Sequence, residues 1–505
     1  MAQRIRGPRP ARTILFGFLL ALVVGTGLLT LPVSTRAPGG IPLLPALFTA
    51  TSALCVTGLS DVDVPTFWTP FGHVVIMALI QIGGFGVMSL ATILGFGVLK
   101  RVSLERRITA ATEAHSSVGH LGPLLIRVLR TGLLIEGLVM VALTLRFLTL
   151  GLPVGQSLWY GLFHAVSAFN NAGFSLFPGN MTLFVGDWFV CLPIMAAIVL
   201  GGLGFPVLHQ LAREFRWPRR WSMNTRMVLF GTVVLLVGST LYITVLEWRN
   251  PGTLGPLPAS QKVLAGMFQA VVSRTAGFNS VDIGAMQDAT LFGMDSLMFI
   301  GGGPAGTAGG IKITTMLVLC FIAWTEIRGE AAVNIFGKRL SRSVHRQAIT
   351  VTMLAALVVA LATLGLLLIT PFTLDETLFE AVSAFGTVGL STGITPYLHP
   401  VGQLIVIGLM IIGRLGPITV ATALARPKPR SLASMSPRRS VHDARADTVA
   451  VIGLGRFGAS VALELMSIDA DVFGIDVDEE LVQRYDGQLT RVVRADTTDE
   501  KALQE

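Results

Sequence analysis

Charged residues are scarce in this chain. Only 13% of its 505 residues are Asp, Glu, Lys or Arg, against roughly 25% in an average soluble domain, and 52% are hydrophobic. An ordinary soluble protein is therefore excluded, and so is a disordered one, because disorder requires low hydrophobicity. The mean hydropathy of +0.68 indicates that most of the apolar residues lie in a lipid bilayer.

Cysteine is also scarce, and Cys55, Cys191 and Cys320 lie inside apolar runs without paired spacing. Neither a disulfide framework nor a metal cluster is supported by that pattern. The net charge of +8 raises the question of nucleic acid binding. The basic residues, however, fall in short runs between apolar stretches, which is typical of membrane topology, so no nucleic acid partner is expected.

Eight apolar stretches reach the length of about 20 residues that a helix needs to cross a bilayer. They lie near residues 12–31, 70–99, 123–150, 186–211, 225–248, 291–325, 346–371 and 401–424. Within each successive pair lies a shorter apolar segment of about 12 to 15 residues, which is expected to form a re-entrant half-helix. The sequence thus predicts an α-helical polytopic membrane protein with four helix, pore loop, helix repeats around a central pore.

The domain boundaries follow from the same pattern. We expect a pore domain at 1–425 with repeats near 12–99, 123–211, 225–325 and 346–424, a linker at 426–447 and a soluble segment at 448–505. Basic clusters at the N-terminus and near 100–107, 213–220, 328–342 and 426–430 fall on one side of the predicted topology. The positive-inside rule therefore puts the N-terminus and the C-terminal segment in the cytoplasm.

Each re-entrant segment ends in a related string. The strings are TSALCVTGL at 51–59, VSAFNNAGF at 166–174, VSRTAGF at 272–278 and VSAFGTVGL at 382–390, with final glycines 115, 104 and 112 residues apart. A short helix aimed at a central axis presents its partially negative C-terminal end to a cation, and the strand after it turns carbonyl oxygens inward. The alternative, that these glycines only pack membrane helices, is disfavoured by four matching positions.

In this order the strings resemble the Ktr/Trk/HKT superfamily of potassium transporters, and the Ktr membrane subunit most closely. The resemblance covers about residues 12–424. It implies a fourfold pseudo-symmetric pore for K⁺ and leaves open whether Na⁺ also binds or passes, because each strand has one glycine where tetrameric K⁺ channels have two. The implied filter residues are Val56, Thr57, Gly58, Leu59, Asn171, Ala172, Gly173, Phe174, Thr275, Ala276, Gly277, Phe278, Thr387, Val388, Gly389 and Leu390.

The sixth apolar stretch contains six glycines and a proline within ten residues. Gly is about 1 kcal/mol and Pro about 3 kcal/mol worse than Ala inside a helix, so the helix is expected to break there. The segment resembles the family's intramembrane gating loop, although Ala305 stands where Gly is usual, and Gly303 and Gly306 stand where Ser is expected. A mere kink for packing is the alternative. The implied gate residues are Gly301, Gly302, Gly303, Pro304, Ala305, Gly306, Thr307, Ala308, Gly309, Gly310 and Arg414.

Arg414 lies in the middle of the last apolar stretch, where a charge costs at least about 2.5 to 3.5 kcal/mol and needs a partner. By the resemblance it lies near the gating loop and raises a barrier to K⁺; a structural ion pair is the rival interpretation. For Arg274 we expect a role in positioning the third filter segment, and for Glu136 a polar neighbour. His164, Asn170 and Asn171 are expected to support the second segment by hydrogen bonds, not to bind ions with their side chains.

The C-terminal segment has the pattern strand, glycine-rich turn, helix, strand, with an acidic residue about 20 residues after the turn. It resembles the nucleotide-binding half of the regulator-of-K⁺-conductance (RCK, TrkA-N) domain and predicts a partial Rossmann-like fold. Only 58 residues follow Asp447, so the second half of that sheet is expected to belong to a longer fusion or another chain. By the resemblance an adenine nucleotide, ATP, ADP or NAD, would contact Gly453, Gly455, Arg456, Gly458, Asp476, Asp496 and Thr497.

The leading interpretation is K⁺ uptake across a bacterial cytoplasmic membrane, regulated by the nucleotide-binding segment. A Na⁺-coupled or weakly selective cation symporter is the alternative. A membrane-bound NAD-dependent enzyme is more remote, because the apolar stretches lack cofactor ligands such as paired His, so no enzymatic activity is expected. The expected partners are the lipid bilayer, a second copy of the chain in a homodimer and an RCK-type cytoplasmic ring.

Overall fold

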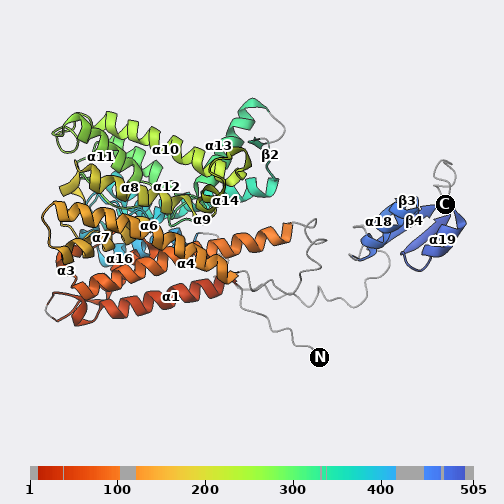
Figure 1. Ribbon diagram of the computed structural model, residues 1–505, viewed down its shortest axis with the longest axis horizontal. Coiled ribbons are helices and arrows are strands. Elements are labelled where there is room, and N and C mark those ends of the chain that lie inside the picture. Colours follow the sequence, from red (N-terminus) through yellow and green to blue (C-terminus); the bar gives the residue numbers. More distant parts are fainter. Residues whose placement is uncertain are drawn as a thin grey trace. The chain divides into compact units, whose positions relative to one another are not determined.

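The computed structural model describes residues 10–37, 39–102, 121–329, 333–336, 338–416, 448–467 and 471–494. The chain forms two compact units, Met1–Ala425 and Arg426–Glu505, and each is described by itself. Figure 1 labels the elements. The linker predicted at 426–447, together with Asp496 and Thr497, lies outside the described residues.

The first unit is built almost entirely of helices in four successive repeats. The first repeat contains α1 (Pro10–Leu29), α2 (Leu43–Cys55), α3 (Val64–Phe67) and α4 (Pro70–Val102). The second contains α6 (Leu121–Thr149), α7 (Val154–Phe169), α8 (Trp188–Leu203) and α9 (Phe205–Glu214). The third contains α10 (Met223–Glu247), α11 (Ala259–Val272), α12 (Asp288–Phe299) and α13 (Ile313–Arg328). The fourth contains α14 (Arg342–Ile369), α15 (Leu374–Gly386) and α16 (Pro400–Leu415), preceded by the short antiparallel pair β1 (Asn334–Ile335) and β2 (Lys338–Arg339).

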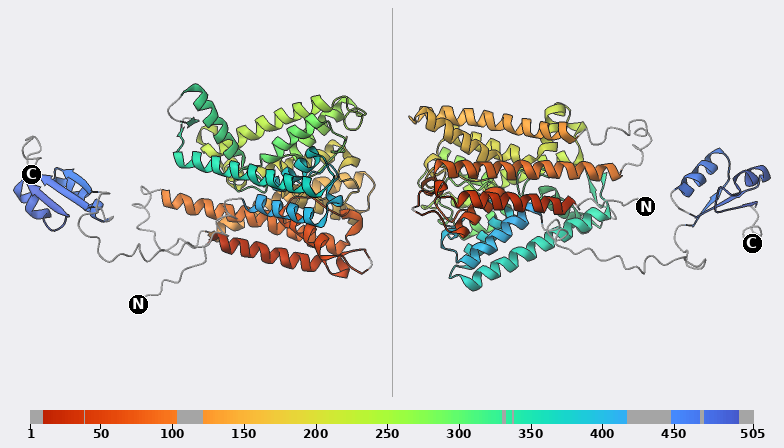
Figure 2. Two further views of the ribbon diagram at one scale, coloured as in Figure 1. Left: turned by 180° about the vertical axis from the view of Figure 1, so that it is seen from behind. Right: turned by 90° about the horizontal axis from the view of Figure 1, so that it is seen from below.

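Three described helices are long and apolar enough to cross a bilayer by themselves: Ile126–Thr149, Met223–Glu247 and Val344–Ile369. The bent pair α8 and α9 would make a fourth span. Shorter apolar helices, among them Phe16–Leu29, Pro70–Gly86 and Pro400–Leu415, form the described parts of other expected spans. The long helices lie alongside one another in both views of Figure 2, as expected for a helical membrane protein.

The fourth expected span is not the continuous helix that its apolar length predicts. The chain bends by 101° between α8 and α9. Gly204 lies at the bend with φ 89° and ψ 145°, outside the helical region, and Pro206 follows two residues later. A Cβ on Gly204 would lie 2.3 Å from the Pro304 carbonyl oxygen, so the bend also makes room for the segment between α12 and α13.

The four short helices α2, α7, α11 and α15 form the centre of the unit. Three of them begin directly after a proline, and the fourth begins with a capping box between Thr373 and Glu376. Their carboxyl-terminal halves are almost entirely buried. They also contribute many of the largest buried side chains: Phe48, Phe163, Phe169, Phe268, Phe379 and Phe385. The hydrophobic core therefore fixes the point at which each short helix ends.

The second unit is a βαβαβ segment, which confirms the predicted partial Rossmann-like fold. Parallel strands are arranged in the order β3 (Thr448–Ile452), β4 (Asp471–Asp476) and β5 (Arg491–Arg494), with Val449 opposite Val472 and Gly474 opposite Val492. Helix α18 (Arg456–Ser467) connects the first two strands and α19 (Glu479–Tyr485) the last two. A small core of Leu454, Ala462, Val472 and Leu489 holds the helices to the sheet.

Candidate ion pathway

The backbone changes its conformation in the same way after each of the four short helices. Within three residues of the end of each helix comes a left-handed residue, and two residues after it comes a glycine that also has a positive φ. These left-handed residues are Val56 (φ 58°), Asn171 (61°), Thr275 (74°) and Thr387 (49°), and the glycines are Gly58 (98°), Gly173 (69°), Gly277 (69°) and Gly389 (94°). The residue between each pair is not left-handed. Alternating handedness turns successive carbonyl groups to the same side of a strand, which is the arrangement an ion-binding filter uses.

The four glycines contact one another's segments in cyclic order. A Cβ on Gly58 would lie 2.4 Å from the Ala172 carbonyl oxygen, and one on Gly173 would lie 2.6 Å from that of Ala276. A Cβ on Gly277 would lie 2.4 Å from the Val388 oxygen, and one on Gly389 would lie 2.0 Å from the Thr57 oxygen. Each glycine thus meets the carbonyl that precedes the glycine of the next segment. The fourth contact returns to the first segment, so the segments close into a ring.

Serine side chains hold three of these segments against their helices. The Ser52 hydroxyl accepts a hydrogen bond from the Gly58 N–H at 3.0 Å, and the Ser383 hydroxyl accepts one from the Gly389 N–H at 3.1 Å. In the second repeat the Ser167 hydroxyl donates to the Phe174 carbonyl at 2.8 Å. Each of these serines lies six residues before the filter glycine, a spacing that could have identified them in the sequence.

The third repeat breaks this pattern. Val271 lies six residues before Gly277, and Ser273 instead donates to the Ala270 carbonyl at 3.1 Å. The string VSRTAGF is two residues shorter between its serine and its glycine than the other three strings. The third segment lacks the serine support, but its Thr275 hydroxyl accepts a hydrogen bond from the Asn171 amide at 3.4 Å.

The second segment is supported by buried polar side chains. The Asn170 amide donates to Glu136 at 2.9 Å and to the Gln81 side-chain oxygen at 3.0 Å, and the Gln81 amide donates to Glu136 at 2.9 Å. The ring of His164 accepts the Leu176 N–H at 3.2 Å through Nε2, so Nδ1 carries the proton and donates to the Tyr160 carbonyl at 2.7 Å. These contacts match the expected supporting roles.

The loop 301–310 between α12 and α13 lies against two opposite filter segments. The Thr307 hydroxyl is 3.2 Å from both the Phe169 carbonyl and the Asn171 side-chain oxygen, at the start of the second segment. A Cβ on Gly309 would lie 2.0 Å from the Thr387 hydroxyl, at the start of the fourth. Because the second and fourth segments lie opposite each other in the ring, the loop crosses the axis between them.

The bend between α8 and α9 anchors this loop. The Gly303 N–H donates to the Gly202 carbonyl at 2.7 Å, and the Thr307 N–H donates to the Gly201 carbonyl at 3.1 Å. In return, the Phe205 N–H donates to the Ala305 carbonyl at 3.2 Å. Backbone groups that lose their helical hydrogen bonds at the bend thus form hydrogen bonds with the loop. Such bonds are required because the membrane interior offers no water to replace them.

Arg414 on α16 is 5% exposed and reaches the loop. Its Nη1 donates to the Thr307 carbonyl and its Nη2 donates to the Gly83 carbonyl at 3.0 Å. Both hydrogen-bond partners that the structure gives this side chain are backbone carbonyls, which favours the loop contact over the structural ion pair. Arg274 is also buried, with its Nε unpaired, and lines a cavity of about 20 Å³ together with Asn171 and Gly302.

The loop differs from its expected composition at a strained position. Ala305 has φ 57°, in the left-handed region where glycine is favoured. A Cβ on Gly303 would lie 2.3 Å from the Leu203 carbonyl oxygen and one on Gly306 would lie 2.9 Å from that of Gly202, so the expected serines would not fit without a shift. Thr307 supplies the loop's one hydroxyl group.

The glycine-rich turn of the second unit has the geometry of a phosphate-binding turn. A Cβ on Gly458 would lie 1.7 Å from the Gly453 carbonyl oxygen, whereas nothing lies within 4 Å of one on Gly453 or Gly455. The Asp476 carboxylate accepts the N–H of Asp478 at 2.9 Å and that of Leu454. These bonds, the Asp478 one foremost, hold the pKa of Asp476 below its ordinary value and leave each oxygen a further lone pair. The description does not cover the Arg456 side chain.

Four pore helices whose following segments close into a ring, with a loop crossing the axis, define a membrane protein of the pore-loop class. The family described as "cation transport protein" (TrkH) matches residues 24–433, and the TrkA-N domain matches residues 449–505. The chain belongs to the TrkH family of cation transport proteins. This confirms the resemblance drawn from the filter strings and the glycine-rich turn.

Named relatives agree with this assignment. The Ktr system potassium uptake protein B of Bacillus subtilis is 40% identical over 422 residues, covering 83% of this chain and 93% of that protein. The protein of the same name from Vibrio alginolyticus is 38% identical over 431 residues, covering 85% and 93%. The potassium/sodium uptake protein NtpJ of Enterococcus hirae is 33% identical over 430 residues, covering 84% and 95%.

A solved structure supports the fold alone. The potassium transporter TrkH from Vibrio parahaemolyticus superposes with a TM-score of 0.64 at 18% identity, covering 84% of this chain and 87% of that chain.

The strain at Ala305 predicts that Ala305→Gly stabilises the protein by about 1 kcal/mol, because an L-residue in the left-handed region costs about 1–2 kcal/mol and glycine gives back part of that through unfolded-state entropy. Thermal unfolding of the detergent-solubilised protein measures the change. Ala308→Gly is the matched control. Ala308 lies in the same loop but has no positive φ, so this substitution should destabilise the protein. Destabilisation of the protein by Ala305→Gly, to the same extent as by Ala308→Gly, would show that Ala305 is not strained.

Proposed function

We propose that this chain takes up K⁺ across the bacterial cytoplasmic membrane through the ring formed by its four filter segments. The observation that carries the proposal is the cyclic contact between each glycine and the next segment's carbonyl. Carbonyl oxygens replace the hydration shell of K⁺ in such a ring, and the buried ends of four short helices add partially negative charge. The potassium uptake proteins among the relatives support the choice of ion.

Permeation of Na⁺ is the second candidate, either through weak selectivity or through Na⁺-coupled uptake. Each filter segment has a single glycine, and one relative is named a potassium/sodium uptake protein. Transport, with no enzymatic reaction, is the activity we assign to the chain.

The loop 301–310 acts as the gate in this proposal. It crosses the axis beneath the ring, and Arg414 donates to the Thr307 carbonyl, so a fixed positive charge lies beside the ion path. Passage of K⁺ then requires the loop to leave the Thr307 contacts. The hydrogen bonds to Gly201 and Gly202 tie that movement to the bend between α8 and α9.

The second unit is the regulatory part of the proposal. Its open turn at Gly453 and Gly455 and the carboxylate of Asp476 suit the phosphates and ribose of an adenine nucleotide. We propose that it works with an RCK-type cytoplasmic ring, that the membrane unit forms a homodimer, and that the N-terminus and the second unit lie in the cytoplasm. The distribution of basic residues between the apolar stretches supports this orientation.

The filter assignment predicts that Gly389→Ser lowers discrimination of K⁺ over Na⁺ by roughly tenfold or more, because the new side chain displaces the Thr57 carbonyl from the ring. Uptake of ⁸⁶Rb⁺ into proteoliposomes and its inhibition by Na⁺ measure the change. Gly393→Ser is the matched control, since Gly393 has a similar φ of 101° but nothing within 4 Å of its Cβ position. If both variants select as the wild type does, Gly389 is a packing residue and the filter assignment fails.

The gate assignment predicts that Arg414→Ala raises the maximal ⁸⁶Rb⁺ flux, because it removes both a positive charge and a hydrogen bond that holds the loop closed. Deleting residues 303–306 should act in the same direction. Arg414→Lys, which keeps the charge but not both hydrogen bonds, should lie between the wild type and the alanine variant. A lower flux in correctly inserted Arg414→Ala would contradict a barrier and favour a structural role.

The regulatory assignment predicts that Asp476→Ala in the full chain weakens adenine nucleotide binding about tenfold, because charge-assisted hydrogen bonds to the ribose are lost. Binding of ATP, ADP and NADH to the purified protein tests this. Asp471→Ala is the control, because Asp471 lies at the opposite end of the same strand. Equal affinities in both variants would remove Asp476 from the binding site.

A further inference from the structure

Lys312 lies at the end of the gating loop and reaches back into it. Its Nζ donates to the Ala308 carbonyl at 2.6 Å, and Ala308 is 1% exposed. Ala308 lies between Thr307, which contacts the second filter segment, and Gly309, which contacts the fourth. The ammonium group is therefore bound to the part of the loop that crosses the pore axis.

Helix stability does not explain a lysine at this position. Lys312 is the N-cap of α13, where the helix dipole is positive and a cation is unfavourable. Arg414 donates to the Thr307 carbonyl next to Ala308, so two positive groups bind consecutive carbonyls. Their repulsion is strong in a low-dielectric interior. The one hydrogen bond that the structure gives the Lys312 side chain is to a carbonyl oxygen, the same kind of ligand that a filter offers to K⁺.

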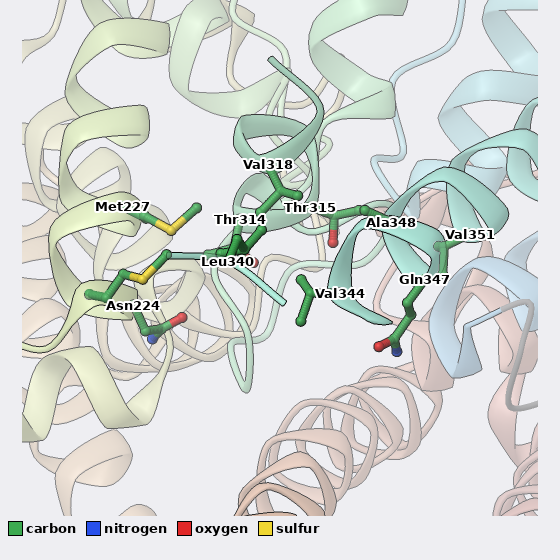
Figure 3. Close-up of a pocket in the computed structure, with 11 residues that line it drawn as sticks. Asn224, Met227, Thr314, Thr315, Val318, Leu340, Val344, Gln347, Ala348 and Val351 are labelled. Atoms are coloured by element: carbon green, nitrogen blue, oxygen red, sulfur yellow. The ribbon is translucent and has the colours of Figure 1, made fainter. Parts of the chain in front are cut away.

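The helix that follows Lys312 has free space beside it. A cavity of about 340 Å³ borders the first turn of α13, and Figure 3 shows Thr314 and Thr315 of that turn facing side chains of α10 and α14 across it. The other lining residues include Met227, Val344 and Gln347. The start of α13, directly after Lys312, is thus not packed tightly on this side.

We propose that the Lys312 ammonium is a tethered cation that occupies the ion path below the filter and has to be displaced by each K⁺ that passes. This inference rests on the proposed transport of K⁺ and adds a charged group to its path. An ammonium carries the same single charge as K⁺ and binds the same carbonyl ligands, so an arriving K⁺ repels it from Ala308. Lys312 then limits the flux by its charge and not by its hydrogen bond.

The test separates charge from hydrogen bonding in the full-length protein reconstituted in liposomes. Lys312→Gln keeps an N–H donor of similar reach but has no charge, and Lys312→Met has neither. A tethered charge predicts that both raise the maximal ⁸⁶Rb⁺ flux by about threefold or more. A simple latch predicts that only Lys312→Met does so. Lys262→Met is the matched control. The Lys262 ammonium also donates to a backbone carbonyl, that of Trp248 at 2.7 Å, but this carbonyl lies at the end of α10 and not in the loop 301–310.

Unchanged or lower flux in Lys312→Gln would overturn the proposal. Absence of ⁸⁶Rb⁺ flux in the wild-type protein would instead contradict the proposed transport itself.

Discussion

The close approach of four glycines to four carbonyl groups is the contact on which the rest of the structure depends. A side chain at any of these glycines would lie within 2.0–2.6 Å of a carbonyl oxygen in the next segment. Polar backbone can lie at membrane depth only where protein satisfies it or where it lines a path for ions. The short helices, their proline or capping-box starts and the phenylalanines that bury their ends all serve to bring these segments to one place.

Below the ring, backbone groups of the loop 301–310 and two positive side chains lie in the membrane interior. The break between α12 and α13 leaves backbone N–H and carbonyl groups without helical hydrogen bonds. Backbone groups beside the bend at Gly204 are their hydrogen-bond partners. Arg414 and Lys312 then bind adjacent loop carbonyls without a carboxylate among the hydrogen-bond partners that the structure gives them. These positive groups repel an entering cation as long as the loop stays in this position.

Much of this arrangement was predictable from the sequence. The repeated strings located the four segments that form the ring, the glycine count located the helix break at 301–310, and the strand pattern located β3, β4 and β5. The bend at Gly204 was missed because the apolar length of 186–211 outweighed the local signal of Gly204 and Pro206. The order of contacts around the ring and the partners of Lys312 were beyond reach, because local periodicity carries no information on contacts between segments about 100 residues apart. The different position of the serine in the third repeat can be seen in the sequence, but only when the four strings are aligned at their glycines.

The most direct test of the account is to locate a heavy K⁺ analogue in the protein by anomalous X-ray scattering. Crystals soaked in Tl⁺ or Rb⁺ should show density on the axis of the ring, equidistant from the segments that contain Gly58, Gly173, Gly277 and Gly389. Excess Na⁺ should reduce that density only weakly. Occupied sites elsewhere in the protein with none on the ring axis would contradict the claim that these four segments form the ion pathway.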